Sequence, residues 1–153
     1  MTKEFIPYQQ AIALKKLGFD EPCFGKFDYT ELEVGGKWSN SLFKNVTEDI
    51  FTAAPTYSQA FRWLREQYNL VIQYIPYELD DGEGQSILYH KYKISEYDSW
   101  RGGRRNTVET ELDEDYELAE LECLKKLIQI CLEQQKATKT GSLNAQAYIG
   151  EKL

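Results

Sequence analysis

The stretch Thr56-Tyr-Ser-Gln-Ala-Phe-Arg-Trp-Leu-Arg-Glu-Gln-Tyr-Asn-Leu-Val-Ile-Gln-Tyr-Ile-Pro-Tyr77 changes its apolar period halfway along. Its first part repeats apolar side chains at helical spacing, namely Tyr57, Ala60, Phe61, Leu64 and Tyr68. Its second part is a run of β-branched and aromatic residues on both faces, as in a strand that is covered on both sides. The stretch therefore predicts a helix over 56–69, capped by Thr56 or Ser58, and a strand over 70–77. Pro76 places the later part of that strand at a sheet edge or at its end.

Two further helices are predicted on either side of this unit. Residues 7–17 begin with a proline and end in two lysines, and Gly18 is suited to a left-handed stop that Phe19 can cover. Residues 114–136 carry acids in the first turns and lysines further along, which complements the helix dipole. The broad apolar face of residues 114–136 is typical of a helix laid across a sheet.

The remaining strands are expected on both sides of the first unit. In the extended region 22–51, Gly35-Gly36 predicts a hairpin turn with a return through Trp38, Leu42 and Phe43. A change of phase near Tyr29 indicates a bulge, and residues 45–54 are expected to hold a short strand around Ile50 and Phe51. A polar turn at residues 80–84 precedes a returning strand over 86–94.

These elements predict a single α+β domain over residues 1–136, with an antiparallel sheet of about four or five strands packed by three helices. After Lys136 we expect a C-terminal tail over 137–153. The tail either docks through Leu143, Ala147, Tyr148 and Ile149 or is disordered.

Composition excludes some functions and favours others. The 153 residues carry a formal net charge of −7, which disfavours general binding to nucleic acid and to an anionic membrane surface. No apolar run approaches the roughly 20 residues of a membrane span, and the first residues lack the apolar core of a secretory signal. Three cysteines, Cys23, Cys123 and Cys131, form no CxxC pair, so we expect a reduced, cytoplasmic protein.

The side-chain inventory favours binding over catalysis. Seven Phe, three Trp and eleven Tyr provide large contact areas, whereas the chain has one histidine, the usual proton shuttle near neutral pH. We therefore expect that the protein is not an enzyme and uses no cofactor.

Three stretches together resemble a family of known sequences. They are Phe5-Ile-Pro-Tyr-Gln-Gln-Ala with Leu17-Gly-Phe-Asp-Glu-Pro-Cys-Phe-Gly25, then Ala54-Pro-Thr-Tyr-Ser-Gln-Ala-Phe-Arg-Trp-Leu-Arg-Glu66, and Ala119-Glu-Leu-Glu-Cys-Leu-Lys-Lys-Leu-Ile128. This pattern, over most of residues 5–130, resembles small uncharacterised proteins of bacteriophages, prophages and mobile elements in Bacteroidetes-type bacteria. The family supplies no activity, cofactor or catalytic residue. The resemblance implies an accessory gene product that works inside a bacterial cytoplasm.

Few residues offer catalytic or metal chemistry. His90 is expected on a strand between apolar neighbours, where a hydrogen-bonded structural role is favoured over catalysis. Cys123 and Cys131 fall on the apolar side of the last helix, as small hydrophobic residues. The acidic runs 80–83 and 109–115 match no calcium-loop pattern, and a solvated turn and a helix start explain them. We expect no metal site.

The segment Trp100-Arg101-Gly102-Gly103-Arg104-Arg105 is the one basic cluster of this acidic chain. Its side chains Trp100, Arg101, Arg104 and Arg105 suggest a phosphorylated or nucleotide ligand. Arginine forks bind phosphate oxygens, glycines admit backbone N–H groups, and an indole stacks on a base. The alternative is a flexible loop whose arginines pair with neighbouring acids.

The 56–69 helix supplies a second candidate surface. Arg62 and Arg65 lie away from its apolar stripe and Trp63 lies near the margin, and these residue types dominate binding hot spots. We expect most of the aromatic rings to pack inside the fold. The favoured function is a non-enzymatic module that binds a host or phage protein, or its own copy. The alternative function is a small-molecule binder that sequesters a phosphorylated ligand at residues 100–105.

Overall fold

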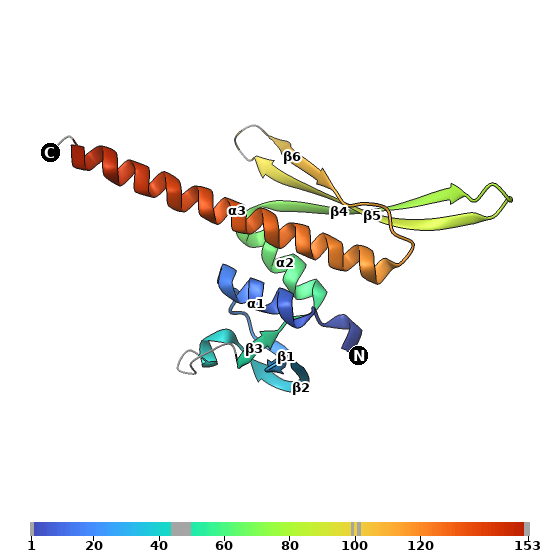
Figure 1. Ribbon diagram of the computed structural model, residues 1–153, viewed down its shortest axis with the longest axis horizontal. Helices are drawn as coiled ribbons and strands as arrows, with labels where there is room; N and C mark the ends of the chain where they lie inside the picture. Colours follow the sequence, from blue (N-terminus) through green and yellow to red (C-terminus); the bar gives the residue numbers. More distant parts are fainter. Residues whose placement is uncertain (1, 44–49, 99, 101, 152–153) are drawn as a thin grey trace.

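The computed structural model describes residues 2–43, 50–98, 100 and 102–151, and of residues 142–151 it describes the backbone. Figure 1 shows its helices and strands along the chain. In order they are η1 (Thr2–Glu4), α1 (Tyr8–Leu17), β1 (Cys23–Asp28), β2 (Glu31–Trp38), η2 (Asn40–Phe43), β3 (Phe51–Ala54), α2 (Tyr57–Tyr68), β4 (Leu70–Asp80), β5 (Ser86–Asp98), β6 (Gly103–Glu109) and α3 (Tyr116–Glu151).

The strands form two sheets. Within the described residues, β2-β1-β3 and β4-β5-β6 are separate three-stranded antiparallel sheets. The predicted α+β class is confirmed, but the prediction of one sheet with four or five strands is wrong. The central strands β1 and β5 each have both edges occupied within their own sheet, and helix α2 lies between β3 and β4 in the chain. No edge is left at which the two central strands can join.

The helices lie between the two sheets (Figure 1). Helix α3 crosses the β4-β5-β6 sheet, while α1 contacts β3 on the opposite side, and both α1 and α2 contact α3. The buried apolar residues form one cluster that draws on both sheets and on the three α-helices, including Leu14, Phe27, Leu64, Ile94 and Leu124. Five aromatic residues among the described side chains belong to this core, namely Phe5, Phe19, Phe27, Trp63 and Tyr92. Seven others are exposed, so the prediction that most rings pack inside the fold is wrong: Phe24, Tyr29, Tyr74, Tyr77, Tyr97, Trp100 and Tyr116.

The ends of α1 follow its sequence signals. Gly18 has a φ of +101°, the left-handed conformation that glycine adopts without strain. The N–H of Gly18 donates to the carbonyl of Lys15, and the N–H of Phe19 donates to that of Leu14. Phe19 is 1% exposed and covers the end of the helix. The predicted glycine stop with its hydrophobic contact is therefore confirmed.

Helix α2 begins with a capping box. The Thr56 hydroxyl accepts a hydrogen bond from the backbone N–H of Gln59, and the Gln59 side chain accepts one from the N–H of Thr56. Thr56, not Ser58, is therefore the cap. Asn69 ends the helix in the left-handed conformation with a φ of +52°, and β4 begins directly after it.

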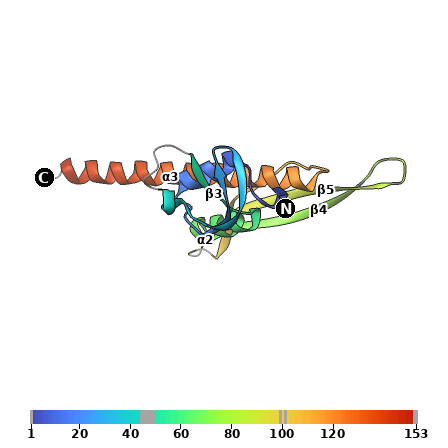
Figure 2. The same ribbon diagram turned by 90° about the horizontal axis from the view of Figure 1, so that it is seen from below.

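Helix α3 is longer than the helix that the sequence pattern predicts. It begins at Tyr116 and continues to Glu151, past Lys136, where the predicted helix ends. Its 36 residues correspond to about 54 Å at 1.5 Å per residue. Figures 1 and 2 show that its C-terminal part projects beyond the rest of the molecule. The tail side chains from Leu143 to Ile149 lie outside the described side chains.

The β1–β2 hairpin corrects the prediction for Gly35-Gly36. The hairpin turns at Tyr29 and Thr30, closed by the pair Asp28 and Glu31, and Tyr29 has a φ of +52°. The two glycines lie inside β2 with φ of +119° and +95°, opposite a break in the register of β1. The bulge predicted near Tyr29 is therefore misplaced, because Tyr29 lies in the turn and the irregularity lies at the two glycines.

After β2 the chain forms the 3-10 helix η2 where a returning strand was predicted. Residues 44–49 lie outside the described residues, and 45–49 are the first part of the stretch predicted to hold a short strand. In the rest of that stretch, β3 begins at Phe51.

The buried side chain of Asn40 in η2 ties three segments together. Its Nδ2 donates to the carbonyl of Phe19 at 2.7 Å, and its Oδ1 accepts from the backbone N–H of Ala53 at 3.0 Å. The side chain is therefore satisfied as both donor and acceptor. One amide joins the end of α1, η2 and β3.

Candidate binding surfaces

The structure separates the arginines of the 100–105 cluster. Arg104 and Arg105 lie in β6, and Arg101 lies outside the described residues. Arg104 donates to Oε1 of Gln73 in β4 at 2.6 Å, whereas Nε of Arg105 donates to Oδ2 of Asp98 at 2.7 Å. Successive strand residues point to opposite faces of a sheet. The two guanidinium groups therefore have different partners and do not form one phosphate cradle.

Trp100 is the most exposed of the described side chains in this cluster. It is 96% exposed in the turn between β5 and β6, where its backbone N–H donates to Asp98. The Arg105–Asp98 ion pair agrees with the alternative in which an arginine of the cluster meets a neighbouring acid.

The three candidates on α2 also have separate environments. Trp63 is 7% exposed and packs edge to face against Phe19, with ring centroids 5.4 Å apart. Arg62 forms an ion pair with Glu21 at 2.6 Å, and Arg65 is exposed. Trp63 belongs mainly to the core, and its remaining surface faces the groove described below.

His90 has the structural role that its position predicts. Its Nδ1 lies 2.7 Å from the Tyr74 hydroxyl, and its ring stacks on Tyr74 and meets the ring of Tyr116 edge to face. Its backbone N–H and carbonyl both bond to Asp113. His90 therefore joins β5 to the start of α3.

The cysteines are buried, and burial raises the pKa of the Cys23, Cys123 and Cys131 thiols to about 12, with Glu21 and Glu120 adding to the effect at Cys23 and Cys123. A thiol that stays protonated is a poor nucleophile. Among the described residues, no group of three His, Cys, Asp or Glu side chains lies close enough to hold a metal ion. In the same part of the chain no helix is both long and apolar enough to cross a membrane.

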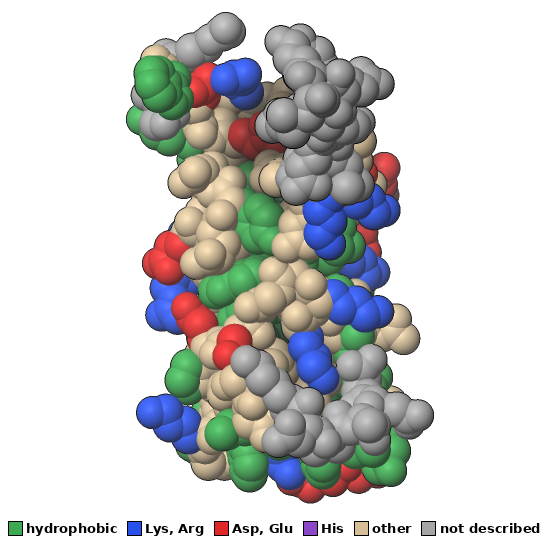
Figure 3. Space-filling view, turned by 90° about the vertical axis from the view of Figure 1, so that its left-hand side faces the viewer, with side chains coloured by type: hydrophobic (Ala, Val, Ile, Leu, Met, Phe, Trp, Pro, Cys, Tyr) green, Lys and Arg blue, Asp and Glu red, His purple; other side chains and the backbone are tan. Residues whose placement is uncertain are grey.

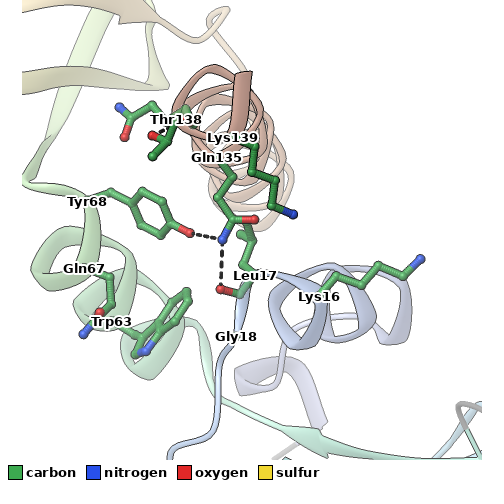
Figure 4. A pocket seen from close by; sticks show the side chains of 10 residues that line it. Lys16, Leu17, Gly18, Trp63, Gln67, Tyr68, Gln135, Thr138 and Lys139 are labelled. Atoms are coloured by element: carbon green, nitrogen blue, oxygen red, sulfur yellow. Dashed lines mark hydrogen bonds between the residues drawn. The ribbon is translucent and has the colours of Figure 1, made fainter. Parts of the chain in front are cut away.

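A groove of about 690 Å³ opens where α1, α2 and α3 meet. Figure 4 shows Leu17 and Gly18 from the end of α1 opposite Trp63 and Tyr68 of α2, with Gln135 of α3 between them. We call it the three-helix groove.

Its floor is held by one amide. Nε2 of Gln135 donates to the Tyr68 hydroxyl at 2.9 Å and to the carbonyl of Leu17 at 3.2 Å (Figure 4). Burial is the largest of the effects that raise the pKa of the Tyr68 phenol, so the hydroxyl stays protonated. Because this hydroxyl accepts the bond from Gln135, its own hydrogen can be donated to a ligand.

The charge of the three-helix groove is opposite to that of the chain. The exposed Lys16 and Lys139 lie on its rim, and none of the described residues that line it is Asp or Glu. The chain as a whole carries −7. An acidic ligand is therefore the ligand class that the groove favours.

Sequence reasoning missed these groove residues except Trp63. Gln135 continues the buried stripe of Cys123, Leu127 and Cys131 at spacings of four. A polar residue at a position of this kind is the available signal, because buried polar groups need partners. The two lysines carry no such signal, since they are far apart in the sequence and only the packing of α1 on α3 brings them together.

The outer part of the β4–β5 hairpin is a second candidate surface. Residues 76–90, which we call the arm, project past the start of α3 at the end of the molecule opposite the α3 C-terminus (Figures 1 and 2). Tyr77, Leu79 and Leu88 on the arm are 44%, 44% and 45% exposed. The strand predicted to be covered on both sides is therefore covered only near Leu70.

The arm is anchored at its base, and beyond the base neither of its edges is paired within the described residues. The backbone of His90 bonds to Asp113, so Pro76, the cross-strand partner of His90, turns its backbone towards the free edge of β4. Proline has no N–H to donate, so this edge lacks one donor there.

The tip of the arm is acidic and ordered by its own hydrogen bonds. Oδ1 of Asp80 accepts from the N–H of Gly82, and Oδ1 of Asp81 accepts from those of Glu83 and Gln85. These side chains are exposed, as expected for the polar turn at 80–84. The result is a fixed turn with clustered negative charge.

Comparison of the chain with protein-family models, with curated proteins and with solved structures gave no match.

Proposed function

We propose that this protein is a non-enzymatic, cytoplasmic binding module that uses the arm to contact another protein or a second copy of itself. The observation that carries the proposal is the exposed apolar side chains on a projecting two-stranded ribbon, with Tyr77, Leu79 and Leu88 each more than two-fifths exposed. Tyr77 and Leu79 lie on one face of the ribbon, and Leu88, the cross-strand partner of Glu78, lies on the other. Exposed apolar side chains on a projecting element mark interaction sites in soluble proteins.

The anchoring of the arm supports the same proposal. The Tyr74–His90 hydrogen bond joins the two strands at its base, and the backbone bonds between His90 and Asp113 fix that base to the segment that leads into α3. A binding element that is already ordered loses less entropy when it binds. The resemblance to phage and mobile-element proteins suggests that a partner is a host or phage protein.

A phosphate ligand at the 100–105 cluster has less support. Arg104 is bonded to Gln73 and Arg105 to Asp98, so a ligand there has to replace existing interactions.

The test uses two double variants. The arm variant carries both Leu79→Ser and Leu88→Ser, and the matched control carries both Leu42→Ser and Leu118→Ser. All four leucines are exposed, and only the first two lie on the arm. Each tagged protein is used to capture partners from lysate of cells that carry the gene, and its self-association is measured by sedimentation velocity.

We expect the arm variant to lose the captured protein or the self-association that the control retains, with unchanged circular dichroism. Equal binding by the two variants contradicts the proposal.

A further inference from the structure

We infer that the three-helix groove of one copy binds the acidic tip of the arm of a second copy, so that the protein associates head to tail. This inference rests on the proposed function of the arm and names its partner.

Charge complementarity is the first argument. The tip of the arm carries Glu78, Asp80, Asp81 and Glu83, all exposed. The groove carries Lys16 and Lys139, with no carboxylate among the described residues that line it. Complementary charges of this kind guide two surfaces together and suppress other arrangements.

The polar and apolar groups of the two surfaces also match. The groove offers the Tyr68 hydroxyl as a donor and the exposed side chain of Gln67, next to the indole of Trp63. The tip carries its carboxylates next to Leu79 on one face of the ribbon and Leu88 on the other. A volume of about 690 Å³ is within the range of specific ligand pockets and suits a short turn.

The positions of the two surfaces suit a head-to-tail arrangement. The arm projects from one end of the long axis (Figures 1 and 2). The groove lies away from the arm, because its α3 residues Gln135, Thr138 and Lys139 follow the part of the helix that crosses the sheet. Figure 3 looks at the end opposite the arm, where hydrophobic side chains lie in the hollow and Lys and Arg side chains gather on one side of it. A contact between unlike surfaces leaves each pair with one unused arm and one unused groove. Association can therefore continue beyond two copies.

Sedimentation velocity of the full chain tests the inference, from about 5 to 500 μM protein, which covers micromolar to sub-millimolar dissociation constants. We expect wild type to form dimers and longer species that decrease when salt is raised, because salt screens exposed charges. The groove variant Lys16→Glu with Lys139→Glu should associate about tenfold more weakly or worse. The matched control, Lys37→Glu with Lys125→Glu, makes the same charge change outside the groove and should associate like wild type.

Two combinations identify the contact. The groove variant keeps an intact arm, and the double variant Leu79→Ser and Leu88→Ser keeps an intact groove. A mixture of the two variants should therefore form dimers, and these dimers should not grow because each has no further intact arm or groove. Adding Glu78→Lys and Glu83→Lys to the groove variant should restore association, because the exchanged charges again attract. Circular dichroism shows whether each variant is folded.

The inference is overturned if wild type stays monomeric, if the groove variant associates like the control, or if the mixture forms no pairs. If wild type is monomeric, the capture experiment still tests whether the arm binds another protein. If the arm variant then loses a captured protein that the control retains, the arm binds a different partner and only the inference has failed.

Discussion

The inner and outer halves of the β4–β5 hairpin share one continuous register and differ in what covers them. In the inner half, Tyr92 and Ile94 are 4% and 1% exposed beneath α3. In the outer half, Leu88 on the same face of β5 is 45% exposed. Both halves are rich in apolar residues, so strand composition alone does not decide burial.

The difference teaches that α3 decides which half belongs to the core. The helix begins at Tyr116, whose ring meets Tyr74 and His90 at the boundary between the two halves. Beyond that boundary the apolar side chains contribute little to folding, because burial is what makes them stabilising. Apolar residues kept on the uncovered half are available for a partner.

The largest difference is expected from removing one tyrosine ring from each half. Tyr92→Ala should lower the free energy of unfolding by about 3 kcal/mol, because it leaves a cavity in the core. Tyr77→Ala should lower it by less than about 1 kcal/mol, as for exposed sites. Urea denaturation followed by circular dichroism measures both. Similar losses in the two variants contradict the division of the hairpin.

The next largest difference is expected between the reactivity of a thiol placed on the arm and that of a thiol buried under α3. A cysteine placed on the arm by Leu88→Cys should react with a thiol reagent at pH 8 about a hundredfold faster than the buried Cys123, whose pKa burial raises to about 12. Mass spectrometry after timed labelling locates the modification. All the thiols should react rapidly in urea. Fast labelling of Cys123 in the native protein means that α3 does not stay on the sheet.

A modest effect is expected at the boundary. Tyr74→Phe removes the hydroxyl that lies 2.7 Å from Nδ1 of His90, and should lower the free energy of unfolding by about 1 kcal/mol. Tyr97→Phe is the matched control, because Tyr97 is also about half exposed. Hydrogen exchange of the arm should increase only in Tyr74→Phe. An unchanged arm shows that the hydrogen bond does not anchor it.

The smallest effect is expected at Glu120, in the first turns of α3. Burial raises the pKa of its carboxyl above the unfolded value, the nearby Glu117 adds to this, and the Tyr116 hydrogen bond opposes it. The folded state therefore holds this proton more tightly, and the stability it contributes is lost as the pH rises through the folded pKa. Glu120→Gln should be slightly more stable than wild type at pH 7 and equal to it at acidic pH below the unfolded pKa. Thermal unfolding at both pH values measures this, and the opposite sign contradicts the burial of the carboxyl.

The sequence predicts those parts of the fold that depend on local signals. Gly18 ends α1 and Thr56 begins α2 as expected, because caps act within a few residues. The hairpin turn at Tyr29-Thr30 was missed because Gly35-Gly36 is the stronger local turn signal. Only the pairing of β2 with β1 shows that the glycines form a bulge.

The remaining features arise from contacts between distant segments. The division into two sheets depends on which edges are occupied, and the exposure of the arm depends on where α3 begins. The three-helix groove combines Lys16 with Lys139, more than a hundred positions away in the chain. Periodicity within one segment does not report these distances. Of the predicted site residues, Trp63 alone lines the groove.

A side chain that replaces Asn40 has to match its hydrogen bonds as well as its shape. Aspartate has nearly the same outline, but its carboxylate has no hydrogen to give to the carbonyl of Phe19, so two oxygens would face each other at a buried site. Leucine fills the space and leaves the Ala53 N–H without an acceptor. Position 40 therefore requires a side chain of this size with one hydrogen-bond donor and one acceptor. Even the exchange of the amide nitrogen for an oxygen removes the donor and breaks one of the two bonds.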